Sequence, residues 1–170
     1  GVRAVGLDTD ARTIALDDGS SLDYEGLVIA TGSSPRRLPN QAPLDGVLEL
    51  RTLADSVNLR DRIADGNARV VIIGAGFIGL EVAATARQKG CTVTVLEGAP
   101  APMIRGLGVE MGIAVAGVHA RNGVDLRCGV QVRGIEGEDG KVTGVTLADG
   151  TFIPADAVVV GVGVAPATEW

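Results

Sequence analysis

The sequence has few aromatic residues, a single histidine and only two cysteines. With four aromatic side chains and a net charge of −6, it lacks the basic, stacking surface that nucleic acids need, so no nucleic-acid partner is expected. Cys91 and Cys128 lack CxxC or metal-ligand spacing. This predicts buried thiols, no metal site and a reducing, cytoplasmic location. His119 has no Ser, Cys or acid at triad spacing, so we expect a solvated surface residue.

Long apolar runs are also missing. The longest, at 155–164 and 70–73, are shorter than the roughly 18 residues of a membrane span, so no membrane association is expected. The chain does not start with a basic and apolar leader, which gives no signal for export. Apolar residues nevertheless make up 46% of the chain, which predicts a packed globular protein. The 170 residues suffice for one domain plus part of another.

The first third of the chain predicts short strands separated by Asp-Gly and Thr-Asp turns. The expected strands are 2–7, 12–16, 21–23 and a buried strand at 27–30. A polar, proline-rich linker over 33–43 follows, and then a helix over 53–65. Thr52 is the expected N-cap of this helix, because Asp55 stands three residues later as in a capping box.

The rest of the chain alternates apolar strands with helices. The expected order is strand 69–73, helix 77–89, strand 92–97, helix 109–121, strand 124–127, three short strands at 130–136, 141–147 and 151–153, and a buried strand at 157–161. Continuously apolar strands alternating with helices are typical of an α/β fold. They predict a Rossmann-like parallel sheet with helices on both faces, over which the three short strands form an antiparallel β-meander.

A glycine-rich turn connects the first of these strands to its helix. In GAGFIG, Gly74, Gly76 and Gly79 have G-x-G-x-x-G spacing, which permits a tight turn, close approach of a diphosphate and close packing of helix on strand. Glu97 ends the next strand, where a carboxylate accepts hydrogen bonds from an adenosine ribose and repels a 2′-phosphate. The pattern favours NAD over NADP. The alternative is an ordinary strand–helix turn with a surface glutamate.

Two stretches of the chain also repeat one pattern. LDDGSSLDYEGLVIATGSSPR, at 16–36, and LADGTFIPADAVVVGVGVAPA, at 147–167, each combine a short strand, an Asp-Gly turn, a second strand and an apolar run ending in x-Gly-x-x-Pro. Together with VVIIGAGFIGLEVAATARQKGCTVTVLE and NGVDLR, these segments resemble the FAD-dependent, NADH-using ferredoxin or rubredoxin reductases of the pyridine nucleotide–disulfide oxidoreductase superfamily.

The resemblance accounts for the repeat. Members of this superfamily have two related dinucleotide-binding domains, for FAD and then NAD, and each domain ends in a meander and a buried strand followed by glycine. The resemblance therefore implies that residues 1–46 are a β-rich remnant of the FAD domain with its linker, and that 47–170 are the NAD-binding domain. The chain would then be a fragment, inactive by itself.

The resemblance also implies roles for individual residues. Glu81 matches a catalytic glutamate that faces the nicotinamide and the flavin, and a solvated helix charge is the alternative. The residues matching NAD contacts are Phe77, as a ring gating the nicotinamide pocket, Ile78 beside the motif glycines, Arg105 at the adenosine ribose or phosphate, and Gly161, Val162 and Gly163 along the nicotinamide-side cleft. Thr31 and Gly32 match an element that contacts FAD. Phe77 as a core aromatic and Arg105 as a free surface residue remain open.

The function implied by the resemblance is electron transfer. Hydride would pass from NADH to FAD, and single electrons would then pass to a ferredoxin or another iron–sulfur protein. One alternative is a disulfide, nitrite or CoA-disulfide reductase of the same superfamily. Another is an NAD-sensing module that never turns over. Unpaired strand edges in the FAD-domain remnant would also allow the fragment to form a homodimer.

Overall fold

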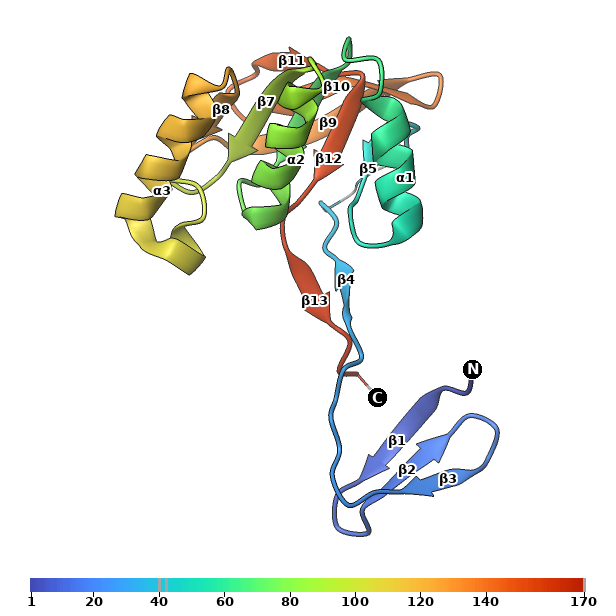
Figure 1. Cartoon of the computed structure of the whole chain (residues 1–170). Helices are drawn as coiled ribbons and strands as arrows, with labels where there is room; N and C mark the ends of the chain where they lie inside the picture. The colour runs from blue at the N-terminus through green and yellow to red at the C-terminus, as the bar shows by residue number, and fades with distance from the viewer. Residues whose placement is uncertain (40, 42, 170) are drawn as a thin grey trace. The chain divides into compact units, whose positions relative to one another are not determined.

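The computed structural model describes residues 1–39, 41 and 43–169, which form two compact units. The larger unit is Pro35–Gly163, and the smaller one combines Gly1–Ser34 with the chain's last residues from Val164 onward (Figure 1). The domain boundary expected after residue 46 concerns the whole protein and stays a prediction.

The smaller unit consists of short antiparallel strands. Its sheet has the order β1-β2-β3, formed by β1 (Ala4–Asp8), β2 (Thr13–Leu16) and β3 (Ser21–Asp23). This confirms the first three expected strands. A second pairing joins β4 (Ser33–Pro35) to β13 (Val164–Pro166), two strands that the sequence did not predict. Close to this pair, the Thr31 hydroxyl donates a hydrogen bond to the carbonyl oxygen of Ala167.

The buried strand expected at 27–30 is wrong. These residues belong to no strand, and the side chains of Val28 and Ile29 are 86% and 57% exposed. An apolar run becomes a strand only when a neighbouring strand satisfies its N–H and C=O groups. Among the described residues no strand pairs with this segment, so its sequence pattern alone could not make it a strand.

The larger unit is built on a parallel five-stranded sheet of order β5-β12-β6-β7-β8. The strands are β5 (Val47–Leu48), β6 (Arg69–Ile73), β7 (Thr92–Glu97), β8 (Asp125–Cys128) and β12 (Ala157–Val160). All but β5, which is only two residues long, were expected. From the central β6 the chain winds outward through β7 and β8 and then returns to add β12 on the other side. The carboxyl ends of β6 and β12 therefore meet where the winding reverses, which is the usual ligand position in such sheets.

Helices cover one face of this sheet and the meander covers the other (Figure 1). The helices are α1 (Leu53–Arg62), α2 (Phe77–Gln88) and α3 (Ile104–Arg121), and the meander strands are β9 (Val132–Glu138), β10 (Lys141–Leu147) and β11 (Phe152–Pro154). The α/β fold, the parallel sheet and the antiparallel meander are thus confirmed, whereas the expectation of helices on both faces is wrong. Apolar residues on both sides of a strand show that both faces are covered, and they do not distinguish a helix from a second sheet.

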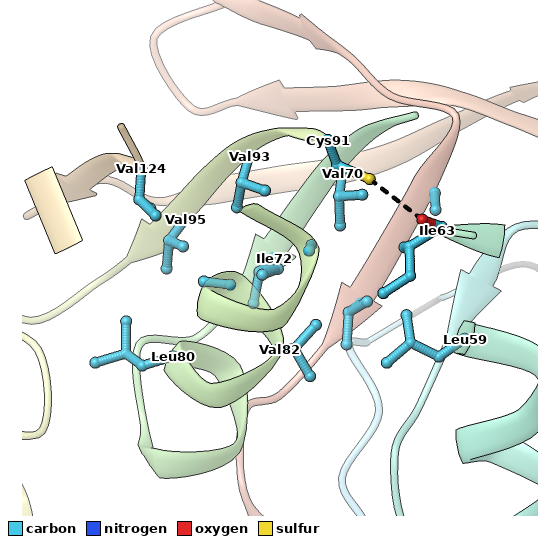
Figure 2. Close-up of a cluster of buried hydrophobic side chains, with 14 of the residues drawn as sticks. Leu59, Ile63, Val70, Ile72, Leu80, Val82, Cys91, Val93, Val95 and Val124 are labelled. Atoms are coloured by element: carbon cyan, nitrogen blue, oxygen red, sulfur yellow. Dashed lines mark hydrogen bonds between the residues drawn. The ribbon is translucent and has the colours of Figure 1, made fainter. Parts of the chain in front are cut away.

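Two apolar cores follow from the alternation of side chains along β6. Val70 and Ile72 point toward the helices, and Figure 2 shows them packed with Leu80 and Val82 of α2. Val71 and Ile73 belong instead to the core under the meander. Burying one such side chain contributes about 1.5–3 kcal/mol, so these two layers dominate the stability of the unit.

The starts of α1 and α3 can be compared with the sequence expectations. The Thr52 hydroxyl accepts a hydrogen bond from the Asp55 N–H at 3.2 Å, and the Asp55 carboxylate accepts one from the Thr52 N–H at 2.7 Å, which confirms the capping box. These hydrogen bonds lower the pKa of Asp55. The expected helix at 109–121 is confirmed. A short helical segment over 104–107, which the sequence did not predict, precedes it and joins it across a kink at Gly108, where φ is +77°. No helix in the described ranges is long and apolar enough to cross a bilayer.

An ion pair between Arg69 and Asp156 connects the amino ends of β6 and β12. The Asp156 carboxylate accepts hydrogen bonds from the Arg69 guanidinium at 2.5 and 2.9 Å, and from the Arg69 backbone N–H at 2.8 Å. These bonds lower the pKa of Asp156. Because both side chains are about half exposed, we expect a contribution of no more than about 1 kcal/mol. This ion pair lies at the amino ends of the strands, at the opposite end of the sheet from the carboxyl ends of β6 and β12.

Candidate functional site

A cavity of about 850 Å³ lies at the carboxyl ends of β6, β7 and β12, within the larger unit. Pockets of roughly 300–1,000 Å³ are typical of small-molecule and cofactor sites. Eight residues predicted from the sequence line it: Gly74, Gly76, Phe77, Glu97, Arg105, Gly161, Val162 and Gly163. The topology therefore brings together residues that are far apart in the chain.

The three motif glycines differ in what surrounds them. Gly74 has φ +103°, and a Cβ there would overlap the carbonyl group of Gly161. A Cβ on Gly79 would overlap the carbonyl oxygen of Gly74. At Gly76, by contrast, a Cβ would meet no atom within 4 Å, so it would project into open space. Packing within the protein thus requires glycine at 74 and 79, whereas at 76 no protein atom excludes a side chain and the space is open to a ligand.

The first turn of α2 has the geometry of an anion-binding helix end. Gly76 is the N-cap, no side chain caps this end, and the first turn carries no acidic residue. The first N–H groups of a helix have no partner within the helix, and the helix dipole adds partial positive charge there. Gly76 thus leaves the uncapped N–H groups at the start of α2 accessible, and a diphosphate group fits such a helix end.

Glu97 connects this turn to the loop that follows β7. Its carboxylate accepts hydrogen bonds from the N–H of Ala75 at 2.7 Å and from the N–H of Ala99 at 2.8 Å. The N–H of Met103 in turn donates to the Ala75 carbonyl at 3.0 Å. Each carboxylate oxygen has a second lone pair, so Glu97 keeps acceptor capacity for a hydroxyl in the cavity. A role in the architecture of the turn was not predicted from the sequence.

The free cysteine of β8 lies beside this carboxylate. Cys128 is half-buried and is the register partner of Glu97 across β7 and β8. Burial raises the pKa of the Cys128 thiol, and the charge of Glu97 raises it further, which keeps the sulfur protonated. Cys91 is buried, as expected, and its pKa is raised by burial as well. His119, expected at the surface, is half-buried, and burial lowers its pKa.

Phe77 and Arg105 are exposed residues of the cavity wall. Phe77 is 55% exposed, which excludes a core aromatic, and its ring lies against Gly106 of α3. A Cβ on Gly106 would come within 3.3 Å of that ring. Arg105 is exposed and makes no hydrogen bond or ion pair with the residues that the structure describes. It is therefore a cation available to an anionic ligand.

Several predicted site residues do not line this cavity. Ile78 is 39% exposed on α2, Gly79 is buried beneath the turn, and Glu81 is exposed one residue beyond Leu80. Thr31 and Gly32 belong to the smaller unit, where the N–H of Ala167 donates to the Gly32 carbonyl. The roles assigned to these five residues remain predictions.

Sequence reasoning missed part of the cavity wall. Most of the missed residues come from the linker, from the segment between β7 and the start of α3, and from the segment between β8 and the start of β9. The full set is Leu38, Ile73, Ala75, Leu96, Gly98, Ala99, Ala101, Met103, Ile104, Gly106, Val130, Gln131 and Val132. The small residues and prolines of GAPAP, directly after Glu97, were a signal that this loop packs closely against something. No comparable signal marks the loop after β8.

A second cavity, of about 620 Å³, lies between the linker, β5 and α1. Its charged residues already have partners. Arg37 pairs with Glu49 at 2.7 Å, and Asp55 belongs to the capping box of α1. It offers no free charge comparable to Arg105.

Comparison with known proteins places this geometry in context. Residues 1–170 match a family model described as pyridine nucleotide-disulphide oxidoreductase. The chain is 44% identical to rhodocoxin reductase from Rhodococcus erythropolis, over 99% of this chain and 40% of that protein.

Solved structures of reductases are also similar to this chain. The ferredoxin reductase for the CYP199A2 system from Rhodopseudomonas palustris is 45% identical and matches with a TM-score of 0.86, over 99% of this chain and 42% of that one. A covalent putidaredoxin reductase–putidaredoxin complex is 38% identical and matches with a TM-score of 0.85, over 97% of this chain and 41% of that one. This chain spans about two fifths of the length of these relatives.

Proposed function

Because this chain belongs to the pyridine nucleotide-disulphide oxidoreductase family, we propose that it is the NAD(H)-binding part of an NADH-dependent flavoprotein oxidoreductase. The whole protein would take hydride from NADH to FAD and pass electrons to a ferredoxin-type iron–sulfur protein. The names of the relatives support this, since they describe ferredoxin reductases and a reductase joined to its putidaredoxin. The two free cysteines fit a reducing, cytoplasmic compartment, which we include in the proposal.

The open space at Gly76 is the observation that carries the NAD(H) proposal. A diphosphate laid on the first turn of α2 would use the N–H groups that a side chain at Gly76 would obstruct. Arg105 supplies a cation to the same anion. Glu97 would accept a hydrogen bond from an adenosine ribose hydroxyl, and its charge disfavours the 2′-phosphate of NADP.

The nicotinamide end of the ligand would lie toward Phe77 and Gly161–Gly163. Bound NADH supplies hydride there, and the work of the protein is to orient the ring and exclude water. The exposed ring of Phe77 is placed to cover the open side of the cavity. Glu81, which lies on α2 outside the cavity wall, is proposed to face the nicotinamide and the flavin in the whole protein.

The whole protein tests this function directly. Mixed with NADH without oxygen, it is expected to lose its flavin absorbance and then to reduce an iron–sulfur acceptor. Glu81→Gln is expected to slow flavin reduction in stopped-flow more than it weakens NADH binding, because nicotinamide placement governs hydride transfer. Glu138→Gln, a matched change on an exposed residue of β9, should alter neither. No flavin in the protein refutes the function, whereas weaker NADH binding at an unchanged rate refutes only the role of Glu81.

The 170-residue chain by itself is expected to bind NADH weakly and to carry no flavin. The glycine turn, the helix end, Glu97 and the end of β12 are all present. Thr31 and Gly32, proposed to contact FAD, line neither of the two cavities described above. Calorimetry should give a micromolar to millimolar Kd, roughly −4 to −8 kcal/mol. A yellow preparation with stoichiometric FAD would contradict this expectation.

A further inference from the structure

Helix α3 is apolar on the side that it presents to solvent. Of its 18 residues only Gly112 is fully buried. Leu107, Met111, Ile113 and Val118 are 40%, 54%, 62% and 49% exposed. Exposed apolar side chains on both flanks of one helix mark a candidate interaction surface.

The residues of α3 that lie opposite buried Gly112 form a line along the helix, and this line is charged only near its two ends. At about 3.6 residues per turn, the side opposite buried Gly112 presents Glu110, Ala114, Gly117 and Arg121. Glu110 and Arg121 are exposed, and neither forms a hydrogen bond or ion pair with any residue that the structure describes. The line therefore has an unpaired acid near one end, an unpaired base at the other, and small residues between them.

When two copies of this helix lie antiparallel, the acid of each copy faces the base of the other. We propose that α3 is a homodimer interface, on which the α3 of a second copy packs antiparallel. A two-fold axis passing between Val115 and Ala116 sets Glu110 against Arg121 of the second copy, and the same pair recurs on the other side of the axis. It also sets Ala114 against Gly117 of the second copy, while Ile113 lies on one flank of this seam and Val118 on the other.

The charges favour a second copy over an unrelated segment as the occupant. An isologous interface needs one surface patch that matches itself, and both charges of this line are satisfied by a copy with no other partner. Ala114 and Gly117 let the two helix backbones approach closely, while the flanking apolar residues fill the sides. This interface is separate from the nucleotide proposal and does not depend on it.

Charge reversal in the whole protein tests the interface. Light scattering and sedimentation over micromolar to millimolar protein should show a concentration-dependent dimer. Glu110→Arg would place two arginines together at each end of the seam, and we expect it to raise the dimer Kd at least tenfold. Arg121→Glu should do the same by juxtaposing two glutamates. The double variant, Glu110→Arg with Arg121→Glu, should restore the original Kd, which no general loss of stability would produce.

Two further measurements decide the remaining outcomes. Glu138→Arg makes the same charge change on β9 and should leave the dimer Kd unchanged. The thiol introduced by Ala114→Cys should react with a maleimide more slowly as the protein concentration rises. A monomer at every concentration, or a double variant as weak as the single ones, would overturn the proposal. If the protein is a monomer and the introduced thiol nevertheless reacts slowly with the maleimide, the rest of the polypeptide covers the helix, and this result would also overturn the proposal.

Discussion

Gly79→Ala is expected to lower the melting temperature of the protein by roughly 2–12 °C, whereas Gly76→Ala should change it little and weaken NADH binding at least tenfold. A Cβ added at Gly79 would overlap the Gly74 carbonyl oxygen, a backbone atom fixed by the sheet. Overpacking of this kind costs about 1–3 kcal/mol, and 1 kcal/mol corresponds to about 2–4 °C in a chain of this size. The backbone cannot move away without separating α2 from β6.

Gly76 is the matched control within the same turn. Its φ of −78° and ψ of −174° suit alanine, and its Cβ would meet no protein atom. We expect its stability cost to stay below about 1 kcal/mol, the ordinary cost of alanine at an N-cap. The methyl group would instead occupy the space that a diphosphate needs. Thermal unfolding and NADH calorimetry on the two variants separate these effects. Equal losses of stability would show that Gly76 is also a packing residue.

Glu97→Arg is expected to change both nucleotide preference and stability. NADH affinity should fall by about 100-fold, and the ratio of NADH to NADPH affinity should shift toward NADPH by at least tenfold, because a cation replaces a ribose acceptor. The N–H groups of Ala75 and Ala99 would also lose their acceptor. Hydrogen bonds to charged groups contribute about 1.5–3 kcal/mol each, so losing both should lower the free energy of unfolding by about 3–6 kcal/mol.

Two comparisons keep the effects of Glu97 separate. Glu97→Gln retains one carbonyl acceptor and no charge, so it should remove the discrimination against NADPH with about half the loss of stability. Glu138→Arg repeats the charge change on exposed β9 and should affect neither quantity. An unchanged nucleotide preference refutes the ribose assignment. An unchanged stability refutes the role of Glu97 in holding the turn.

Local patterns predicted most of the larger unit. The apolar strand β6, the glycine turn, α2 and β7 follow one another directly along the chain, and each has a clear periodicity or a cap. The segment at 27–30 has an equally strong apolar pattern and forms no strand. Strand formation depends on a partner, and no described segment pairs with it, so its sequence could not decide the outcome.

The site divides in the same way. The position of Gly76 and Glu97 on the cavity wall could be predicted, because Gly76 belongs to a recognisable turn and Glu97 ends the strand that follows. The bond from Ala75 to Glu97 could not, since it depends on how β6 and β7 lie side by side. The wall residues Val130 and Gln131 were missed for a related reason. They reach the cavity only through the position of β8 at the edge of the sheet.

The hydrogen bonds of Glu97 bear on the thermodynamics of ligand association. Ala75, Ala99 and Met103 are held in place by the protein's own groups, so we expect the turn to keep this conformation when the proposed nucleotide binds. A preorganised loop loses little conformational entropy on association, and more of the contact energy remains as affinity. The heat-capacity change of binding then reflects apolar surface covered by the ligand, without a contribution from loop folding.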